Sequence, residues 1–149
     1  MAVVLTSRKT ARAQLKSVLK TGIEAIFDID GWALAAYESE PKDFGGQSPA
    51  LTVNSDGSMT LFADYARELH RFWVTTYWKR DDPDTTEDAI DDLSVAVRQT
   101  LLDNAEEVGY WQDLIFDEEF SEVAYVLIDN VQYRSERLRV TVYSVCDNT

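Results

Sequence analysis

VLIDNVQYRSERLRVTVYSV, residues 126 to 145, predicts two β-strands joined by a tight turn at Asp129-Asn130. The second half alternates strictly, with Leu138, Val140 and Val142 on one side and Arg137, Arg139, Thr141 and Tyr143 on the other. This pattern predicts a strand with one face in a core and one polar face.

The arginines of this strand stand out because the chain is strongly acidic. It has 14 Lys and Arg against 27 Asp and Glu, and its net charge is -13. The first 27 residues hold five basic residues against Glu24 alone, whereas residues 81–129 hold sixteen acids against Arg98. Coating DNA requires a basic surface, so this balance argues against that role. It permits contacts between the basic part of one copy and the acidic part of another.

Length and composition indicate a single domain over residues 1–149, large enough to bury about two-thirds of the surface of the unfolded chain. The one cysteine, Cys146, cannot form an internal disulfide, which favours a reducing cytoplasm. The apolar run at Ala2 to Leu5 is too short for a signal sequence. No stretch reaches the roughly twenty apolar residues that cross a bilayer. We therefore expect a soluble protein with no membrane partner.

Two amphipathic helices are expected. The first runs from about Arg8 to Ile26 behind a Thr6 or Ser7 cap, with apolar residues at Ala11, Leu15, Val18, Leu19, Ile23 and Ile26. The second begins after Pro83 with Asp84 or Thr85 as its cap and ends at Gly109. Its expected buried stripe is Ile90, Leu93, Val97, Leu101 and Ala105.

The remaining segments predict strands. Trp32 to Tyr37, His70 to Lys79 and Trp111 to Phe116 are rich in aromatic or branched residues. Asn54-Ser55-Asp56-Gly57 predicts the turn of a hairpin between residues 51–54 and 58–62, and residues 63–69 remain ambiguous. The expected fold is α+β and two-layered: a mixed, mostly antiparallel sheet of about four strands, with two main helices on one face and an extra β-hairpin.

The sequence indicates no catalytic chemistry. His70, the only histidine, begins a strand and is interpreted as a surface or packing residue, and Cys146 lies too close to the chain end for a protected thiol. Asp28-Ile29-Asp30-Gly31 begins like a calcium loop, but it has Gly at the fourth position and Ser39 at the twelfth. We therefore expect a protein that is not an enzyme and that has no cofactor and no metal site.

The alternative to an enzymatic role is a protein–protein interface. Trp73 and Tyr77 on one strand, and Tyr133, Tyr143, Arg134, Arg137 and Arg139 on another, are of the types enriched where proteins meet. We predict that these seven residues form a subunit or tube interface. The competing interpretation, left open, is that the aromatic residues are core and that the arginines pair with local acids, Arg137 with an acid on the neighbouring strand.

The order of these segments resembles the tail terminator (tail completion) family of long-tailed bacteriophages. The resemblance covers nearly the whole chain, and its segments are the helix at Arg8–Ile26, SPALTV at residues 48–53, RFWVTTYWKRDD at 71–82, TTEDAIDDLSVAVRQTLL at 85–102, Trp111-x-x-Leu114 and YRSERLRVTVYSV at 133–145. Residues 61–69 depart from the glycine-rich polar loop expected in the family.

The resemblance implies a mixed sheet flanked by helices and a structural virion protein at the tail–neck junction, made in the host bacterial cytoplasm. It implies a homo-oligomer, a hexameric ring, that caps the tail tube and ends its polymerisation. The implied partners are the major tail tube protein and a head-side connector or stopper protein. DNA would pass through the lumen without specific binding, which an acidic ring favours because it repels phosphate.

Two other functions stay open. A head-completion adaptor or stopper forms similar rings. An acidic DNA-mimic inhibitor belongs to another class, and its support is the row of acids at Asp84, Glu87, Asp88, Asp91 and Asp92. The basic first helix and the arginine-bearing strand count against a uniform acidic face.

Overall fold

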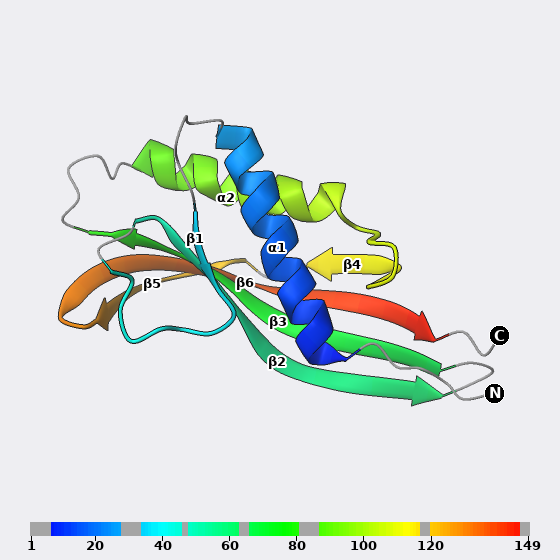
Figure 1. Cartoon of the computed structure of the whole chain (residues 1–149). Helices are drawn as coiled ribbons and strands as arrows, with labels where there is room; N and C mark the ends of the chain where they lie inside the picture. The colour runs from blue at the N-terminus through cyan, green and yellow to red at the C-terminus, as the bar shows by residue number, and fades with distance from the viewer. Residues whose placement is uncertain are drawn as a thin grey trace.

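Two helices lie on one side of a six-stranded sheet in the computed structural model, which describes residues 7–27, 34–45, 48–62, 66–80, 87–116 and 120–146 (Figure 1). The helices are α1 (Arg8–Phe27) and α2 (Glu87–Asp103). The strands are β1 (Ala35–Tyr37), β2 (Ala50–Phe62), β3 (Ala66–Lys79), β4 (Asp113–Phe116), β5 (Glu122–Ile128) and β6 (Val131–Cys146). The α+β class is confirmed, with six strands in place of about four.

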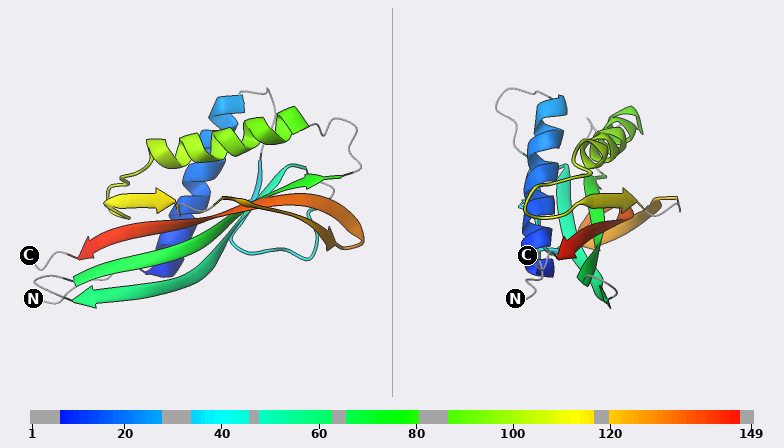
Figure 2. Two further views of the ribbon diagram at one scale, coloured as in Figure 1. Left: turned by 180° about the vertical axis from the view of Figure 1, so that it is seen from behind. Right: turned by 90° about the vertical axis from the view of Figure 1, so that its right-hand side faces the viewer.

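Strand β6 organises the sheet, whose order is β1-β2-β3-β6-β4 with β5 also paired to β6. One edge of β6 pairs with β3 from Tyr133 to Cys146. Its other edge pairs with β5 near the hairpin and with β4 farther along. Only the β1–β2 pair is parallel, so the sheet is mixed as expected. Figure 2 shows the long strands β2, β3 and β6 lying side by side, with β3 antiparallel to the other two.

The prediction of a hairpin turn at residues 54–57 is wrong. Strand β2 runs through this segment, and its pairing with β3 shifts register between Ser55 and Ser58. Asp56 and Gly57 on β2 thus lie opposite Arg71 alone on β3, which is a β-bulge. Gly57 has φ of 115°, a backbone conformation that glycine adopts at little cost. The same turn-forming residues therefore bend a strand here without reversing it.

Helix α1 follows its sequence pattern closely. The Ser7 hydroxyl accepts a hydrogen bond from the Thr10 amide at 3.0 Å, so Ser7 is the N-cap. The buried stripe is Ala11, Leu15, Leu19 and Ile23. The expected stripe extended to Ile26, but that residue is half exposed, whereas the next residue, Phe27, packs against the main core.

Helix α2 also buries its expected stripe, but it is shorter than expected. Ile90, Leu93, Val97 and Leu101 are all buried. The helix ends at Asp103, and Gly109 (φ 87°) instead belongs to a turn between Glu107 and Trp111, which form an isolated bridge. Ala105 accordingly lies outside the helix.

The closing hairpin is confirmed. Asp129 and Asn130 have φ of 49° and 62°, and they connect the paired residues Ile128 and Val131. Positive φ at both turn residues matches the twist of the flanking strands. Several expectations fall outside the described residues. They are the caps at Thr6, Asp84 and Thr85, the start of the Trp32 strand and the Asp28-to-Gly31 segment.

The sheet has a hydrophobic core on each face. The main core lies between the helices and the sheet and includes Leu15, Leu93, Phe72 and Val140. The smaller core is on the opposite face, where Phe44 covers Tyr77 and Tyr133 at ring-centroid distances of 4.9 and 5.2 Å. The rest of that opposite face is here called the open face, and it carries the candidate site.

Candidate functional site

Trp73 lies at the centre of the open face, between two arginines. The β3–β6 register places Trp73 opposite Arg139 and the next pair, Thr75 and Arg137, beside it. The guanidinium carbons of Arg137 and Arg139 lie 4.1 and 4.4 Å from the centroid of the Trp73 ring. At these distances a cation is attracted by the negative face of the indole, and each contact contributes about 0.5–1 kcal/mol at an exposed site. The three side chains therefore hold one another in place.

Both arginines also have acidic partners in their own chain. Arg139 forms an ion pair with Asp56 at 3.0 Å, and Arg137 forms one with Glu122 of β5 at 2.7 Å. Asp56 is shared, because Arg71 lies 3.7 Å from the same carboxylate oxygen. Pairing with local acids, one of the two interpretations left open by the sequence, is thus observed for these arginines.

The β2 bulge places Asp56 in this site. Two β2 residues opposite one β3 residue displace the strand locally, and Asp56 comes to serve both Arg71 and Arg139. One carboxylate oxygen thus lies within ion-pair distance of two guanidinium groups. Sequence reasoning missed Asp56, Arg71 and Glu122, because only the strand register shows which acids meet which arginines.

Arg134 lies on the other side of the sheet. It pairs in register with Trp78, and it forms an ion pair with Glu87 in the first turn of α2. The hydrogen bond to Glu87 raises the pKa of the Arg134 guanidinium, although burial acts in the opposite direction. This contact connects β6 to α2. The structure does not bring Arg134 together with Arg137 and Arg139.

The three predicted tyrosines occupy two different environments. Tyr77 and Tyr133 are 4% and 2% exposed and belong to the core beneath Phe44. Burial raises the pKa of the Tyr77 phenol, and the nearby Glu40 carboxylate adds to that effect. Tyr143 is partly exposed on the open face, where Arg67 lies 5.6 Å from its ring centroid. Of the three tyrosines, Tyr143 is thus the one with surface to offer a partner.

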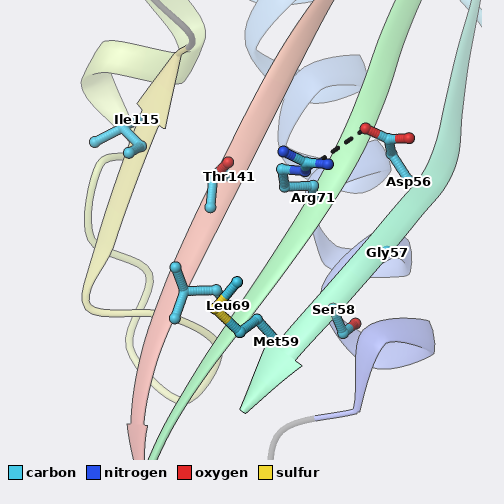
Figure 3. Close-up of a pocket in the computed structure, with 8 residues that line it drawn as sticks. All are labelled: Asp56, Gly57, Ser58, Met59, Leu69, Arg71, Ile115 and Thr141. Carbon is cyan, nitrogen blue, oxygen red and sulfur yellow. Dashed lines mark ion pairs between the residues drawn. The ribbon is translucent and has the colours of Figure 1, made fainter. Parts of the chain in front are cut away.

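Two hollows flank the central cluster. The first, of about 360 Å³, is lined by Asp56, Gly57, Ser58, Met59, Leu69, Arg71, Ile115 and Thr141 (Figure 3). Its floor is apolar, and the Asp56–Arg71 pair lies at its rim. The second, of about 400 Å³, is lined by Glu40, Asn54, Trp73, Thr75, Tyr77, Glu122, Ala124, Val126, Ser135 and Arg137. The open face is therefore not flat, because it has a concave region on each side of the central cluster.

His70 is a packing residue on the helix side of the sheet. It is 2% exposed, and its Nδ1 lies 2.6 Å from the Ser58 hydroxyl oxygen. Within the described residues, no group of three or more His, Cys, Asp or Glu side chains could hold a metal ion. Across the same part of the chain, neither helix is long and apolar enough to cross a membrane.

The fold has a counterpart among solved structures. A chain in a structure of the virion of a native gene transfer agent particle has a TM-score of 0.50 with this chain at 14% sequence identity. The match covers 93% of this chain and 96% of the other. No protein-family model matches the sequence, and no curated protein matches it either. The similarity therefore concerns the fold, and it extends over essentially the whole of both chains.

Proposed function

We propose that this protein is a structural virion component of the tail terminator type. Copies assemble into a hexameric ring that caps the tail tube, ends its polymerisation and joins it to the head-side connector. The observation that carries this proposal is the fold similarity to a gene transfer agent virion chain, which covers 93% of this chain. The order of sequence segments supports the same conclusion independently of the coordinates.

The open face supports an assembly role because it presents preorganised groups of the types used at interfaces. Trp and Arg are enriched among residues that dominate binding energy. Trp73 is held between Arg137 and Arg139, and each arginine is held by its own acid. Side chains that are already ordered lose little conformational entropy on binding. A partner would thus meet a surface that needs little rearrangement.

The seven predicted interface residues take different parts in this proposal. Trp73, Arg137, Arg139 and Tyr143 contact the neighbouring subunit or the tube. Tyr77 and Tyr133 support the open face from the core beneath Phe44. Arg134 ties β6 to α2 from the other side of the sheet through Glu87. Because the arginines have intrachain partners, their pairing with a neighbour's acids extends these ion pairs into networks.

Tube-growth arrest tests the function directly. Purified protein added to polymerising tail tube protein should stop elongation and leave a ring at one end, as seen by electron microscopy. An adaptor or stopper would leave elongation unchanged, and that result would contradict the terminator role. The mass of the assembled ring, measured by light scattering, should be six times the 16.9 kDa of the chain.

A variant of the central tryptophan tests the surface. Trp73→Ala should weaken ring formation or tube binding roughly tenfold or more, because it removes the aromatic plate between the two arginines. Leu102→Ala, at an exposed apolar position on α2, is the matched control and should assemble normally. Thermal unfolding identifies any loss of folding. Normal assembly by a folded Trp73→Ala variant would contradict the assignment of this face.

A further inference from the structure

The second hollow of the open face, beside Trp73, has a floor of hydroxyl groups. Its volume is about 400 Å³, within the range of roughly 300–1,000 Å³ that small-ligand sites have. Thr75 and Tyr77 of β3 and Ser135 of β6 line it and are 6%, 4% and 5% exposed. Tyr77 lies directly opposite Ser135 in the β3–β6 register. We call it the Glu40 hollow, after the exposed carboxylate that also lines it.

The charged residues that line the Glu40 hollow are Glu122, Arg137 and Glu40. Arg137 and Glu122 neutralise each other in an ion pair at 2.7 Å. Within the described part of the chain, Glu40 forms no ion pair and accepts one long hydrogen bond, from the Tyr77 hydroxyl at 3.4 Å. In addition to burial, the Glu40 charge raises the pKa of the Tyr77 phenol, so this carboxylate acts on the interior of the hollow. Its negative charge is available to a cation from outside the chain.

The hydroxyl groups of the floor offer acceptor oxygens to a ligand. The Tyr77 hydroxyl donates its proton to Glu40, and the Ser135 hydroxyl donates its proton to the Ala124 carbonyl at 3.3 Å. A hydroxyl oxygen that has donated its proton still has two lone pairs for other donors. The floor therefore favours a ligand that brings its own N–H donors.

Apolar side chains form the wall of the hollow on the β5 side. Ala124 and Val126 line it from β5, and the Trp73 ring lines it from β3. Ala124 and Val126 are two residues apart on one strand, so both point to the open face. The methylene groups of a flexible stem pack against such a wall while a charged end keeps its polar contacts. The lining as a whole matches a cation on an aliphatic stem.

We propose that the Glu40 hollow binds a primary ammonium group on an aliphatic stem, with the ammonium against Glu40 and the stem along the β5 wall. An ammonium is a compact cation with three donors and no acceptor, which suits a carboxylate beside hydroxyl oxygens. Two sources have this chemistry: a lysine of a neighbouring copy, such as the exposed Lys9, and a free aliphatic amine. The inference does not depend on the proposed tail function, because the site lies within a single chain.

Titration with n-pentylammonium chloride at low salt tests the site on the isolated chain. The indole N–H resonance of Trp73, assigned with Trp73→Phe, should shift and saturate, because Trp73 lines the hollow. The neutral alcohol n-pentanol has the same stem and should bind at least about threefold more weakly, as expected for losing one partly exposed ion pair. Equal binding of n-pentanol, or no saturable shift of Trp73, would overturn the proposal and leave the tail function untouched.

Two variants separate the charge of the hollow from its shape. Glu40→Gln removes the charge at nearly constant size, so the affinity for n-pentylammonium should fall about threefold to fivefold. Ala124→Phe fills the hollow from an exposed position on β5 and should abolish the saturable shift. Asp92→Asn, which removes one negative charge from an exposed position on α2, is the matched control and should bind like the wild type. Wild-type affinity in either folded variant of the hollow would overturn the site.

Self-association, measured by light scattering, distinguishes the two sources of the ammonium. If a lysine of a neighbouring copy occupies the hollow, Glu40→Gln should weaken self-association by a similar factor, and n-pentylammonium should compete with it. If a free amine is the ligand, Glu40→Gln should self-associate like the wild type while it binds n-pentylammonium more weakly. Both results support the site, and each identifies its ligand.

Discussion

Asp56 determines the charge arrangement of the open face. Its carboxylate is the shared partner of Arg71 and Arg139, and Arg139 in turn lies over the Trp73 ring. Both Asp56 and Arg139 are mostly shielded from solvent, with side-chain exposures of 23% and 27%. An ion pair at that depth is screened less than one in full solvent. Asp56 thus reaches across β3 to hold Arg139 on β6, and through Arg139 it helps to fix the position of Trp73.

Because the Tyr77 phenol is buried, we predict that the free energy of unfolding decreases at alkaline pH. Its pKa is raised above 10.0 in the folded protein by burial, so the unfolded chain releases this proton at a lower pH than the folded chain does. Above about pH 10 the folded state binds more protons, and the free energy of unfolding therefore falls as the pH rises. Below that pH both states are protonated and the group has no effect.

The measurement is urea unfolding between about pH 8 and about pH 11. Tyr77→Phe should flatten the alkaline decline relative to the wild type, whatever its effect on stability at neutral pH. Tyr125→Phe, at an exposed tyrosine, is the control and should keep the wild-type slope. An unchanged slope in Tyr77→Phe would mean that another group causes the decline.

At the scale of elements, α1 and α2 cross at a glycine. A Cβ placed on Gly22 would lie 2.8 Å from the Thr100 hydroxyl oxygen and 3.2 Å from the Thr100 Cβ. Thr100 is buried in α2, so it has little room to move. Real Cβ atoms essentially never approach other atoms within 3.0 Å. Gly22 therefore allows the close approach of the two helices.

Gly22→Ala should destabilise the protein by about 1–3 kcal/mol through overpacking, although alanine is the better helix former by about 1 kcal/mol. Thr100→Ala in the same chain should recover part of the loss, because it removes the clashing atoms. A double-mutant cycle by chemical denaturation measures this coupling. Stabilisation by Gly22→Ala alone would show that the helices are farther apart.

The β2 segment shows why local signals misled the prediction of one element. Asn54-Ser55-Asp56-Gly57 has the composition of a two-residue turn, and local composition cannot distinguish a turn from a bulge. The distinction is made by β3, which is long enough to pair with β2 on both sides of the bulge, from Phe62 to Ala50. Long-range pairing thus overrides the local preference to turn.

At the scale of the whole molecule, a net charge of -13 predicts weak contact with DNA. Binding to the phosphate backbone depends on releasing counterions through basic residues, and the paired arginines of the open face are already matched to acids. Double-stranded DNA should therefore migrate unretarded in a gel with this protein, even at low salt. A salt-sensitive shift would contradict a ring through which DNA passes freely.

The sequence alone determined the elements with strong periodicity. The stripes of α1 and α2, the alternation of β6 and the Asp129-Asn130 turn are local patterns, and each was predictable because its energetic cause lies within a few residues. The acidic balance and the α+β class followed from the same information. The ends of α2 and the number of strands were less predictable from the sequence, because the boundaries of elements depend on weak local preferences and on packing.

Tertiary structure alone decided which surfaces these elements form. Tyr77 and Tyr133 became core because Phe44, more than thirty residues before Tyr77, covers them, and Arg134 faces α2 because of its register on β6. The choice of acids beside Arg137 and Arg139 likewise depends on pairing between distant segments. The physical reason is that a one-residue change of register moves every side chain of a strand to the other face, and register is a property of two strands together.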